Sequence, residues 1–227
     1  AAMIEMAMYA HELTDRKRAE PADDLWTVLT TATVTLDDGT VTELTDLERD
    51  LFFTLLLVAG NETTRNAVSL GIMGFMDHPD QWGRITGGAE MDEAAVDEVL
   101  RFTSPVNYFR RTATADTELG GELIRAGDKV TLWYASGNRD EAVYEDPHRL
   151  DLSRSPNHHL AFGGGGAHFC LGASLARLEL KVIFEALASR MPDIEATGPA
   201  DRLRMSLVNG IKHLPVSFTP SEPVLTA

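Results

Sequence analysis

The chain has 227 residues, of which 44% are hydrophobic and 24% charged, so it is long enough and apolar enough to bury a core. Its net charge of -15 at pH 7 disfavours nonspecific binding to nucleic acids or anionic membranes, because both need a cationic surface. A single cysteine excludes an internal disulfide, and we therefore expect a reducing, cytoplasmic compartment.

No linker, repeat or low-complexity tract divides the sequence, so we expect residues 1–227 to form a single domain. The longest apolar run, residues 51–60, is shorter than the about 20 residues that a membrane-spanning helix needs, and no transmembrane segment is expected. No signal peptide is recognisable either. Because the chain opens Ala-Ala-Met and continues directly into a helical pattern, we interpret it as a piece of a longer protein.

Helix and turn signals dominate the N-terminal part of the chain. Apolar residues at three- and four-residue steps predict a helix over residues 1–19. Asp23 or Asp24 can cap a second helix that ends near Thr33. Residues 34–44 contain an Asp-Gly turn signal and predict a small hairpin.

A long helix is expected next. Thr45 and Glu48 have the spacing of a capping box, and the helix that they open should end near residue 77, before Pro79. Residues 51–59 are apolar on nearly every side, which predicts burial all round.

The C-terminal part alternates short helices, short strands and one long irregular segment, residues 138–160, whose length is typical of functional loops. The predicted elements are a short helix after Pro79, a helix over residues 92–102, strands of which 129–134 is clearest, a last helix over 171–190 and weak strands over 193–219. That last helix carries a stripe of Leu171, Leu175, Leu178, Val182 and Leu187. The predicted fold class is mainly α with small β elements.

A glycine-rich segment before the last helix contains the only cysteine and reads Phe162-Gly-Gly-Gly-Gly-Ala-His-Phe-Cys-Leu-Gly172. Glycines let the backbone approach a flat ligand closely, and a helix N-terminus stabilises a thiolate at Cys170, the form that binds metal. The alternatives are a buried structural cysteine beside a glycine turn, or a phosphate-binding loop. The latter is disfavoured because no Gly-Lys-Ser/Thr follows.

Residues 59–64, Ala-Gly-Asn-Glu-Thr-Thr, place an acid and a hydroxyl in the middle of the long apolar helix. Such groups are costly there unless they have a role, and Gly60 removes side-chain bulk where a small ligand can press in. The simpler alternative is a helix kink with Glu62 paired to Arg65. A third motif, Glu98-Val-Leu-Arg101, is an i, i+3 pair that is common on helices, and Asp97 would serve as Arg101's partner equally well.

In this order, the three motifs resemble the cytochrome P450 family over nearly the whole chain. The resemblance implies the C-terminal half of that fold, a single partial domain whose N-terminal half is absent. It implies a haem b monooxygenase that uses O2, with iron held by the Cys170 thiolate. Glu62 and Thr63 are implied to deliver protons, while Arg111 and His168 would bind the haem propionates. The other implied haem-binding residues are Phe162, Gly163, Gly164, Gly172, Ala59 and Gly60.

The resemblance also implies a structural ion pair between Glu98 and Arg101, completed by Arg149, with Arg154 as the less favoured third member. One departure concerns Phe162, which lies eight residues before Cys170 although the family usually has an aromatic residue at seven, where this chain has Gly163. The residues implied to line the substrate pocket are Leu55, Val58, Ala59, Asn107, Phe109, Leu207 and Val208.

The amino-acid sequence of residues 59–66, 165–171 and 209–213 is most similar to that of bacterial enzymes that hydroxylate sterol side chains and methyl-branched lipids. This resemblance implies an apolar substrate. The implied electron donor is a ferredoxin with its NAD(P)H-dependent reductase. We expect Arg154, Arg177 and Lys181 to give its docking surface a positive charge. The alternative is a non-catalytic fragment that binds haem poorly or not at all.

Overall fold

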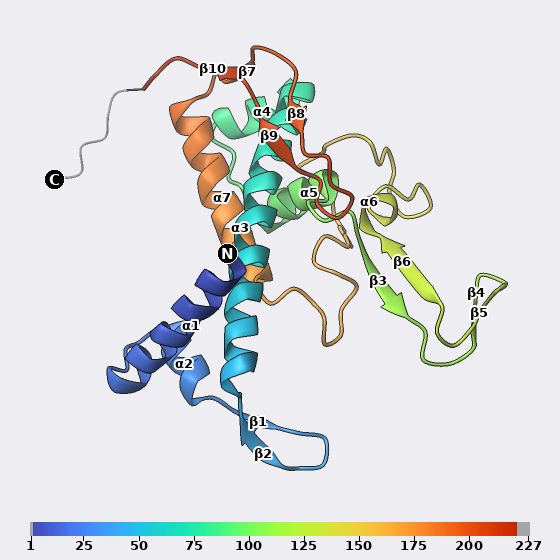
Figure 1. The fold of residues 1–227 in the computed structure, drawn as a ribbon. Coiled ribbons are helices and arrows are strands. Elements are labelled where there is room, and N and C mark those ends of the chain that lie inside the picture. Colours follow the sequence, from blue (N-terminus) through green and yellow to red (C-terminus); the bar gives the residue numbers. More distant parts are fainter. Residues whose placement is uncertain (1, 222–227) are drawn as a thin grey trace. The chain divides into compact units, whose positions relative to one another are not determined.

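The computed structural model of the protein describes residues 2–221 and is drawn in Figure 1. The chain divides into two compact units, Ala1–Glu62 and Thr63–Ala227, and the division falls inside one long helix. Helices provide most of the regular structure, and each sheet has two strands. The predicted class, mainly α with small β elements, is confirmed, while the assignment of a single domain stays a prediction.

The first unit consists of helices and one hairpin, in the places that the sequence predicts. Asp24 caps its second helix by accepting a hydrogen bond from the Thr27 amide at 2.8 Å. Gly39 has a φ of +84°, in the left-handed region that the hairpin turn requires. The elements are α1 (Ala2–Ala19), α2 (Leu25–Thr31), β1 (Thr33–Thr35), β2 (Val41–Glu43) and the start of α3 (Asp46–Asp77).

The predicted capping box opens α3. The Thr45 amide donates to Glu48 Oε2 at 2.7 Å, and the Glu48 amide donates to Thr45 Oγ1 at 3.2 Å. The helix ends at Asp77, before Pro79, as expected. In the part of the chain that the structure describes, neither this helix nor any other is long and apolar enough to cross a membrane.

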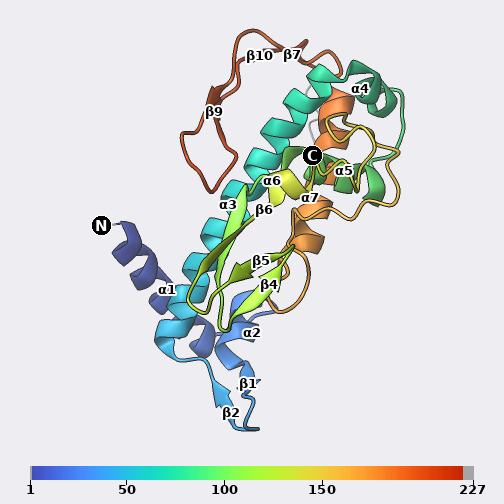
Figure 2. The same cartoon turned by 90° about the vertical axis from the view of Figure 1, so that its right-hand side faces the viewer.

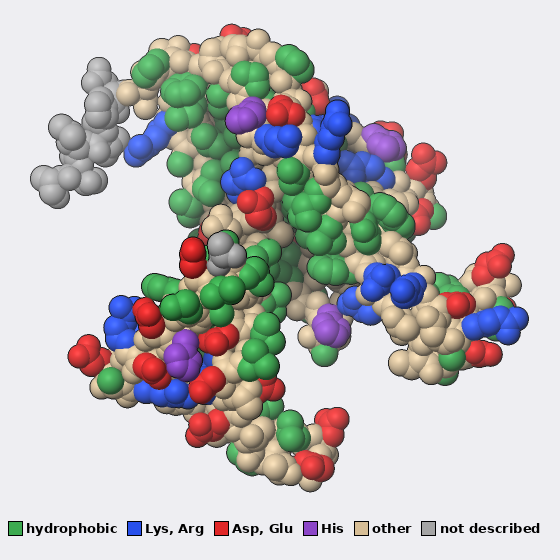
Figure 3. All heavy atoms as spheres, viewed as in Figure 1, with side chains coloured by type: hydrophobic (Ala, Val, Ile, Leu, Met, Phe, Trp, Pro, Cys, Tyr) green, Lys and Arg blue, Asp and Glu red, His purple; other side chains and the backbone are tan. Residues whose placement is uncertain are grey.

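The prediction that residues 51–59 are buried all round is wrong for this chain. Leu51, Leu55 and Val58 expose more than half of their surface, and Leu57 exposes 42%. Figure 3 shows apolar side chains on the surface in the region of α3. Phe53 packs against Tyr9 and Trp26, so the described chain covers only part of this apolar stretch.

The second unit combines helices with four small antiparallel sheets, paired β3 with β6, β4 with β5, β8 with β9 and β7 with β10 (Figure 2). Its helices, besides the rest of α3, are α4 (Pro79–Thr86), α5 (Glu93–Thr103), α6 (Tyr134–Gly137) and α7 (Ala173–Arg190). Its strands are β3 (Tyr108–Thr112), β4 (Thr117–Leu119), β5 (Glu122–Ile124), β6 (Lys129–Trp133), β7 (Glu195–Ala196), β8 (Asp201–Arg202), β9 (Ile211–His213) and β10 (Val216–Ser217).

The core of this unit lies where α3, α5 and α7 meet. Val99, Leu180 and Phe184 are fully buried in it. A Cβ atom at Gly71 would lie 2.5 Å from the Phe184 ring and 3.2 Å from a Val99 methyl, so glycine is needed for this close approach. This packing fixes α5, which carries Glu98 and Arg101, and α7, which directly follows the Cys170 loop.

The apolar stripe predicted for the last helix faces mostly away from this core. Leu175, Leu178 and Val182 each expose more than half of their surface, and Leu171, just before the helix, exposes 76%. Leu187 alone of the five packs against the core. The face that α7 buries consists of Ala173, Leu180, Phe184 and Ala188.

Candidate functional site

The glycine loop folds back on itself and leads Cys170 to the start of α7. Gly163, Gly165 and Gly166 have φ angles of +90°, +103° and +76°, which glycine adopts without strain. The Cys170 amide donates to the Phe162 carbonyl at 3.0 Å, which closes the loop. Gly163, seven residues before Cys170, has a positive φ that disfavours an aromatic residue at that position. The buried aromatic ring is Phe162, eight residues before Cys170.

Cys170 is a free, half-buried thiol beside a helix N-terminus. Gly172 is the N-cap of α7, and no side chain of the described residues accepts a hydrogen bond from the helix's first amides. The positive end of the helix therefore remains available to stabilise a thiolate. A cysteine that only fills the core would be fully buried, whereas Cys170 is half-buried.

The open face of the loop suits a large flat ligand. A Cβ atom added at Gly164, Gly165 or Gly172 would meet nothing of the described chain within 4 Å. Phe169, beside Cys170, is 46% exposed. Among the described residues no group of three or more His, Cys, Asp or Glu side chains gathers to hold a metal ion.

The second motif lies on α3, whose helical hydrogen bonding continues through residues 59–64. Ala59 and Gly60 are exposed, whereas Glu62 and Thr63 are half-buried. A Cβ atom at Gly60 would meet nothing of the described chain within 4 Å, so the helix surface is open there. The structure therefore has room for a ligand at this turn of the helix.

The predicted ion pair between Glu98 and Arg101 is present and fully buried on α5. Arg101 binds the carboxylate with two nitrogens, Nε to Oε2 at 2.7 Å and Nη2 to Oε1 at 2.8 Å. Its guanidinium also donates to the carbonyl oxygens of Asn138, Pro147 and Arg149. The pair thus fastens the irregular segment 138–160 to α5, and a buried charge pair needs such complete hydrogen bonding.

The prediction that Arg149 completes this ion pair is wrong. The Arg149 guanidinium bonds to Asp80 on α4, and only its backbone carbonyl reaches Arg101. Arg154, the less favoured alternative, donates from Nε to Glu98 Oε2 at 3.1 Å and is the third member. Sequence spacing could not separate the two arginines because both lie in the same irregular segment.

Three predicted pocket residues meet near the end of α5. The Asn107 amide donates to the Leu207 carbonyl at 2.8 Å, and Val208 forms an isolated β-bridge with Val106. Phe109 follows on β3 and is 45% exposed. Leu55 and Val58 are exposed on the part of α3 that belongs to the first unit.

The two predicted propionate ligands are solvent-accessible. Arg111 lies on β3, where Nη1 donates to the neighbouring Arg110 carbonyl at 3.1 Å. His168 lies in the glycine loop, two residues before Cys170. Both are exposed and therefore available to an anionic group.

Sequence reasoning missed the polar residues that hold the irregular segment. Asn138 is fully buried, accepts from the Leu160 amide at 2.6 Å and donates to Ser104 Oγ at 2.9 Å. Asn157 donates to Glu98 Oε2 at 3.1 Å. Their only signal in the sequence was the unusual length of the segment.

Comparison with known proteins agrees with this arrangement. A sequence model of the family described as Cytochrome P450 matches residues 90–191, the range that holds the ion pair and the cysteine loop. The protein belongs to the cytochrome P450 family. A steroid C26-monooxygenase of Rhodococcus jostii (strain RHA1) is 47% identical over 218 residues, which are 96% of this chain and 45% of that relative. A methyl-branched lipid omega-hydroxylase of Mycobacterium bovis is 48% identical, covering 95% of this chain and 49% of the relative.

Solved structures show the same fold. CYP109E1 from Bacillus megaterium, in complex with testosterone, superposes with a TM-score of 0.86 at 36% identity, over 95% of this chain and 59% of that one. A Mycobacterium marinum cytochrome P450, CYP268A2, in complex with pseudoionone, gives 0.83 at 44% identity, over 95% and 51%. This P450 chain spans about half the length of the curated relatives that it matches.

Each of the three cations that we expected to give this P450 chain a positive docking surface has a carboxylate partner. Arg154 pairs with Glu98, Arg177 with Asp97 at 2.7 Å, and Lys181 with Glu90 and Glu185. Glu98 also pairs with Arg101 and does not cancel both charges, so the local positive charge stays a prediction.

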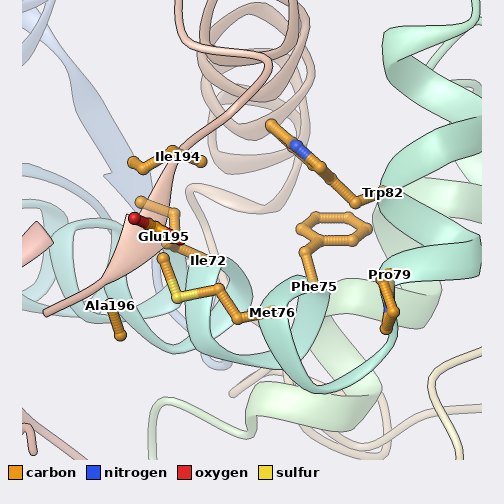
Figure 4. A pocket seen from close by; sticks show the side chains of 8 residues that line it. All are labelled: Ile72, Phe75, Met76, Pro79, Trp82, Ile194, Glu195 and Ala196. Atoms are coloured by element: carbon orange, nitrogen blue, oxygen red, sulfur yellow. The ribbon is translucent and has the colours of Figure 1, made fainter. Parts of the chain in front are cut away.

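A separate apolar pocket of about 310 Å³ lies between α3, α4 and β7. Figure 4 shows the Trp82 and Phe75 rings side by side at one end, and the Trp82 indole donates to the Pro192 carbonyl at 2.8 Å. None of the residues that we predicted to bind haem, deliver protons or contact the substrate lines this pocket. The lining residues are Ile72, Phe75, Met76, Pro79, Trp82, Ile194, Glu195 and Ala196.

Proposed function

We propose that the whole protein is a haem-thiolate monooxygenase that hydroxylates an apolar substrate with O2. The observation that carries the proposal is the loop that presents Cys170, a free and half-buried thiol, at the open N-terminus of α7. The buried Glu98–Arg101 pair, which lies in the same range that the cytochrome P450 family model matches, supports the proposal.

The residues of this chain would have distinct roles in holding the haem. Cys170 would ligate the iron as a thiolate, and Arg111 and His168 would bind the propionates. Phe162, Gly163, Gly164 and Gly172 would shape the face of the loop that contacts the haem, and Ala59 and Gly60 on α3 would be further haem-binding residues. When bound, haem b supplies the iron at which O2 reacts, and thiolate ligation favours O–O cleavage.

Glu62 and Thr63 would move protons towards the oxygen site. They are adjacent in sequence and half-buried, next to the open surface at Gly60. A carboxylate exchanges protons with solvent, and a hydroxyl can both accept and donate a hydrogen bond, so the two form a short relay. Glu98 and Arg101 would only fix the scaffold, because both are fully buried.

The substrate would be a sterol-like or methyl-branched lipid. Two of the similar proteins are named for the hydroxylation of steroids and of methyl-branched lipids. The residues predicted to line the pocket, such as Phe109, Leu207 and Val208, are largely apolar, which suits a lipid. Asn107 would be the polar exception among the residues near the end of α5.

Electrons would come from a ferredoxin and its NAD(P)H-dependent reductase. The ion pairs of Arg177 and Lys181 weaken the electrostatic argument for docking at those two residues. A cytoplasmic location is proposed from the single cysteine.

Replacing Cys170 by Ser in the whole protein tests the ligand. We expect the wild-type ferrous–CO complex to show the red-shifted Soret band of thiolate ligation and the variant to lose it. Ser174→Ala, an exposed position at the start of α7, is the control and should keep the band. A thiolate band that survives Cys170→Ser would overturn the ligand assignment.

The alternative is that residues 1–227 have no activity of their own and would be a non-catalytic fragment of such an enzyme. The observation in its favour is the exposed apolar surface of α3 and α7, including Leu55, Val58, Leu175 and Val182.

A further inference from the structure

A second charged cluster, centred on Asp97, lies one residue before the structural Glu98 and has no role in the proposed function above. The Asp97 carboxylate accepts from Arg177 Nε at 2.7 Å and from Arg177 Nη2 at 3.3 Å. It also lies 3.2 Å from His159 Nε2. Asp97 is on α5, Arg177 is on α7 and His159 is in the irregular segment, so one carboxylate joins three separate elements.

The hydrogen bonds of His159 fix its orientation. Its Nδ1 accepts from the Ala161 amide at 3.2 Å, so the ring proton resides on Nε2 and points to Asp97. The side chain is only 4% exposed. Both ring nitrogens are therefore satisfied, and the ring holds the backbone of residues 159–161 against α5.

Arg177 connects the same cluster to the cysteine loop. Its guanidinium carbon lies 4.8 Å from the centre of the Phe162 ring, within the range of a cation–π contact. The His159 ring contacts Phe162 from another side, with centroids 5.6 Å apart. Phe162 is thus held by both partners of Asp97.

Phe162 in turn holds Cys170. Its carbonyl accepts the Cys170 amide at 3.0 Å, and its ring packs against Phe169, the residue before Cys170, with centroids 6.2 Å apart. Asp97 therefore acts on Cys170 through Arg177, His159 and Phe162, without touching the thiol.

The charges of the cluster favour an ionised Asp97. Burial alone would raise the pKa of this carboxyl, but hydrogen bonds from His159 and Arg177 outweigh burial and lower the pKa below its ordinary value. Arg177 provides the balancing charge, and its side chain is 26% exposed.

We propose that Asp97 is a positioning residue that, through His159 and Arg177, fixes Phe162 and thereby the conformation of the loop that presents Cys170. This inference rests on the proposed role of Cys170 as the haem ligand. Without the carboxylate, Arg177 and His159 lose their common acceptor and Phe162 is free to shift. The Cys170 amide then loses a fixed acceptor, so the loop holds Cys170 in its ligating position in a smaller share of the molecules.

The main test uses the whole haem-loaded protein and the ferrous–CO spectrum, whose red-shifted Soret band marks molecules in which Cys170 is bound as in the wild type. We expect Asp97→Asn and Arg177→Gln each to raise the ratio of molecules without this band to molecules with it about fivefold, which corresponds to about 1 kcal/mol. The double variant should be no worse than the worse single variant, because both remove the same contact. Lys181→Gln, which removes a paired cation one turn further along α7, should leave the ratio unchanged.

A conservative substitution at Arg177 separates a positioning role from an effect on general stability. Arg177→Lys keeps the charge but not the two-nitrogen contact or the flat stacking on Phe162, so we expect an intermediate ratio. If Asp97→Asn and Lys181→Gln raise the ratio equally, or if the two single effects multiply in the double variant, the proposal is wrong.

A second measurement remains informative if a variant loads haem poorly. The rate of alkylation at Cys170 is measured by mass spectrometry of its peptide in the haem-free whole protein. Asp97→Asn should increase this rate, while Lys181→Gln should not, and equal rates in all three proteins would overturn the proposal. If the wild-type protein lacks a thiolate band while these rates differ as expected, the haem-ligand proposal fails but the positioning of the loop stands.

Discussion

Arg154 Nε lies 3.1 Å from Glu98 Oε2, so the end of a long irregular segment is tied directly to the buried carboxylate of α5. The same guanidinium donates to the Glu145 carbonyl at 2.8 Å. Glu98 Oε1 meanwhile accepts from the Asp151 amide at 2.9 Å. The segment is therefore ordered by hydrogen bonds to buried side chains, Glu98, Arg101 and Asn138, rather than by regular secondary structure.

Substitution of Arg154 should cost far more stability than substitution of Arg149. We expect Arg154→Gln to destabilise the whole protein by about 1.5–3 kcal/mol, the usual loss for a buried hydrogen bond to a charged group. Arg149→Gln removes a half-exposed pair with Asp80 and should cost about 0–1 kcal/mol. Denaturant unfolding of both variants measures the difference, and a larger loss for Arg149→Gln would contradict the assignment of Arg154.

Removal of the Thr63 hydroxyl should uncouple electron use from product formation. If Thr63 delivers protons, Thr63→Ala should consume NAD(P)H but release a larger share of the electrons as peroxide. Thr64→Ala, the next residue on α3, is the matched control and should remain coupled. The ratio of peroxide to product in the reconstituted whole protein gives the answer, and an unchanged ratio in Thr63→Ala would favour a structural role for the motif.

Asn66 on α3 should be required for the stability of the segment that carries Leu207 and Val208. Asn66 is fully buried, and its Oδ1 accepts from the Ile211 amide at 3.0 Å. Asn66→Ala leaves that buried amide without its acceptor, which should cost about 1–3 kcal/mol.

The control for Asn66 is Asn61→Ala, an exposed position on the same helix, which should change stability by less than about 0.5 kcal/mol. Denaturant unfolding measures both variants. Hydrogen exchange of the Ile211 amide adds a local readout, and protection equal to wild type in Asn66→Ala would show that another group satisfies this amide.

Asp97 should contribute to the pH dependence of folding. Its pKa is lowered in the folded protein, since hydrogen bonds from His159 and Arg177 outweigh the opposing effect of burial. Its stabilising contribution is therefore complete above its unfolded pKa of about 3.9 and is lost as the pH falls through the lower folded value. Asp97→Asn lacks this titration, so its unfolding midpoint should fall less steeply than that of wild type below about pH 5. Parallel curves would contradict the assigned interactions.

Local signals in the sequence were enough to predict much of the fold. The Thr45–Glu48 capping box and Pro79 mark the two ends of α3, because caps and proline act within one turn of helix. The Glu98–Arg101 pair was equally local, at a spacing of three residues. The Cys170 loop was predictable for the same reason, since its glycines and its cysteine are close neighbours in the sequence, directly before a helix.

Contacts between distant residues could not be predicted from the same signals. The choice between Arg149 and Arg154 depends on how residues 138–160 fold, and they follow no periodic pattern. Asp97, His159 and Arg177 are ordinary charged residues in the sequence, and only the packing of α5 beside α7 brings them together. Likewise, the sequence showed the Leu175–Val182 stripe but not which side of α7 faces the core.

Residues 1–227 expressed alone should self-associate. Leu175, Leu178 and Val182 form an exposed apolar face on α7, and Leu55 and Val58 are exposed on α3. Burying a large apolar side chain contributes about 1.5–3 kcal/mol, so these faces favour self-association. We expect this polypeptide to form oligomers or aggregates on sizing and to bind haem poorly. Leu175→Gln with Val182→Gln should reduce the association but destabilise the whole protein, if its remaining half covers the stripe. A soluble 227-residue monomer with stoichiometric haem and a thiolate CO band would instead show that the chain functions alone.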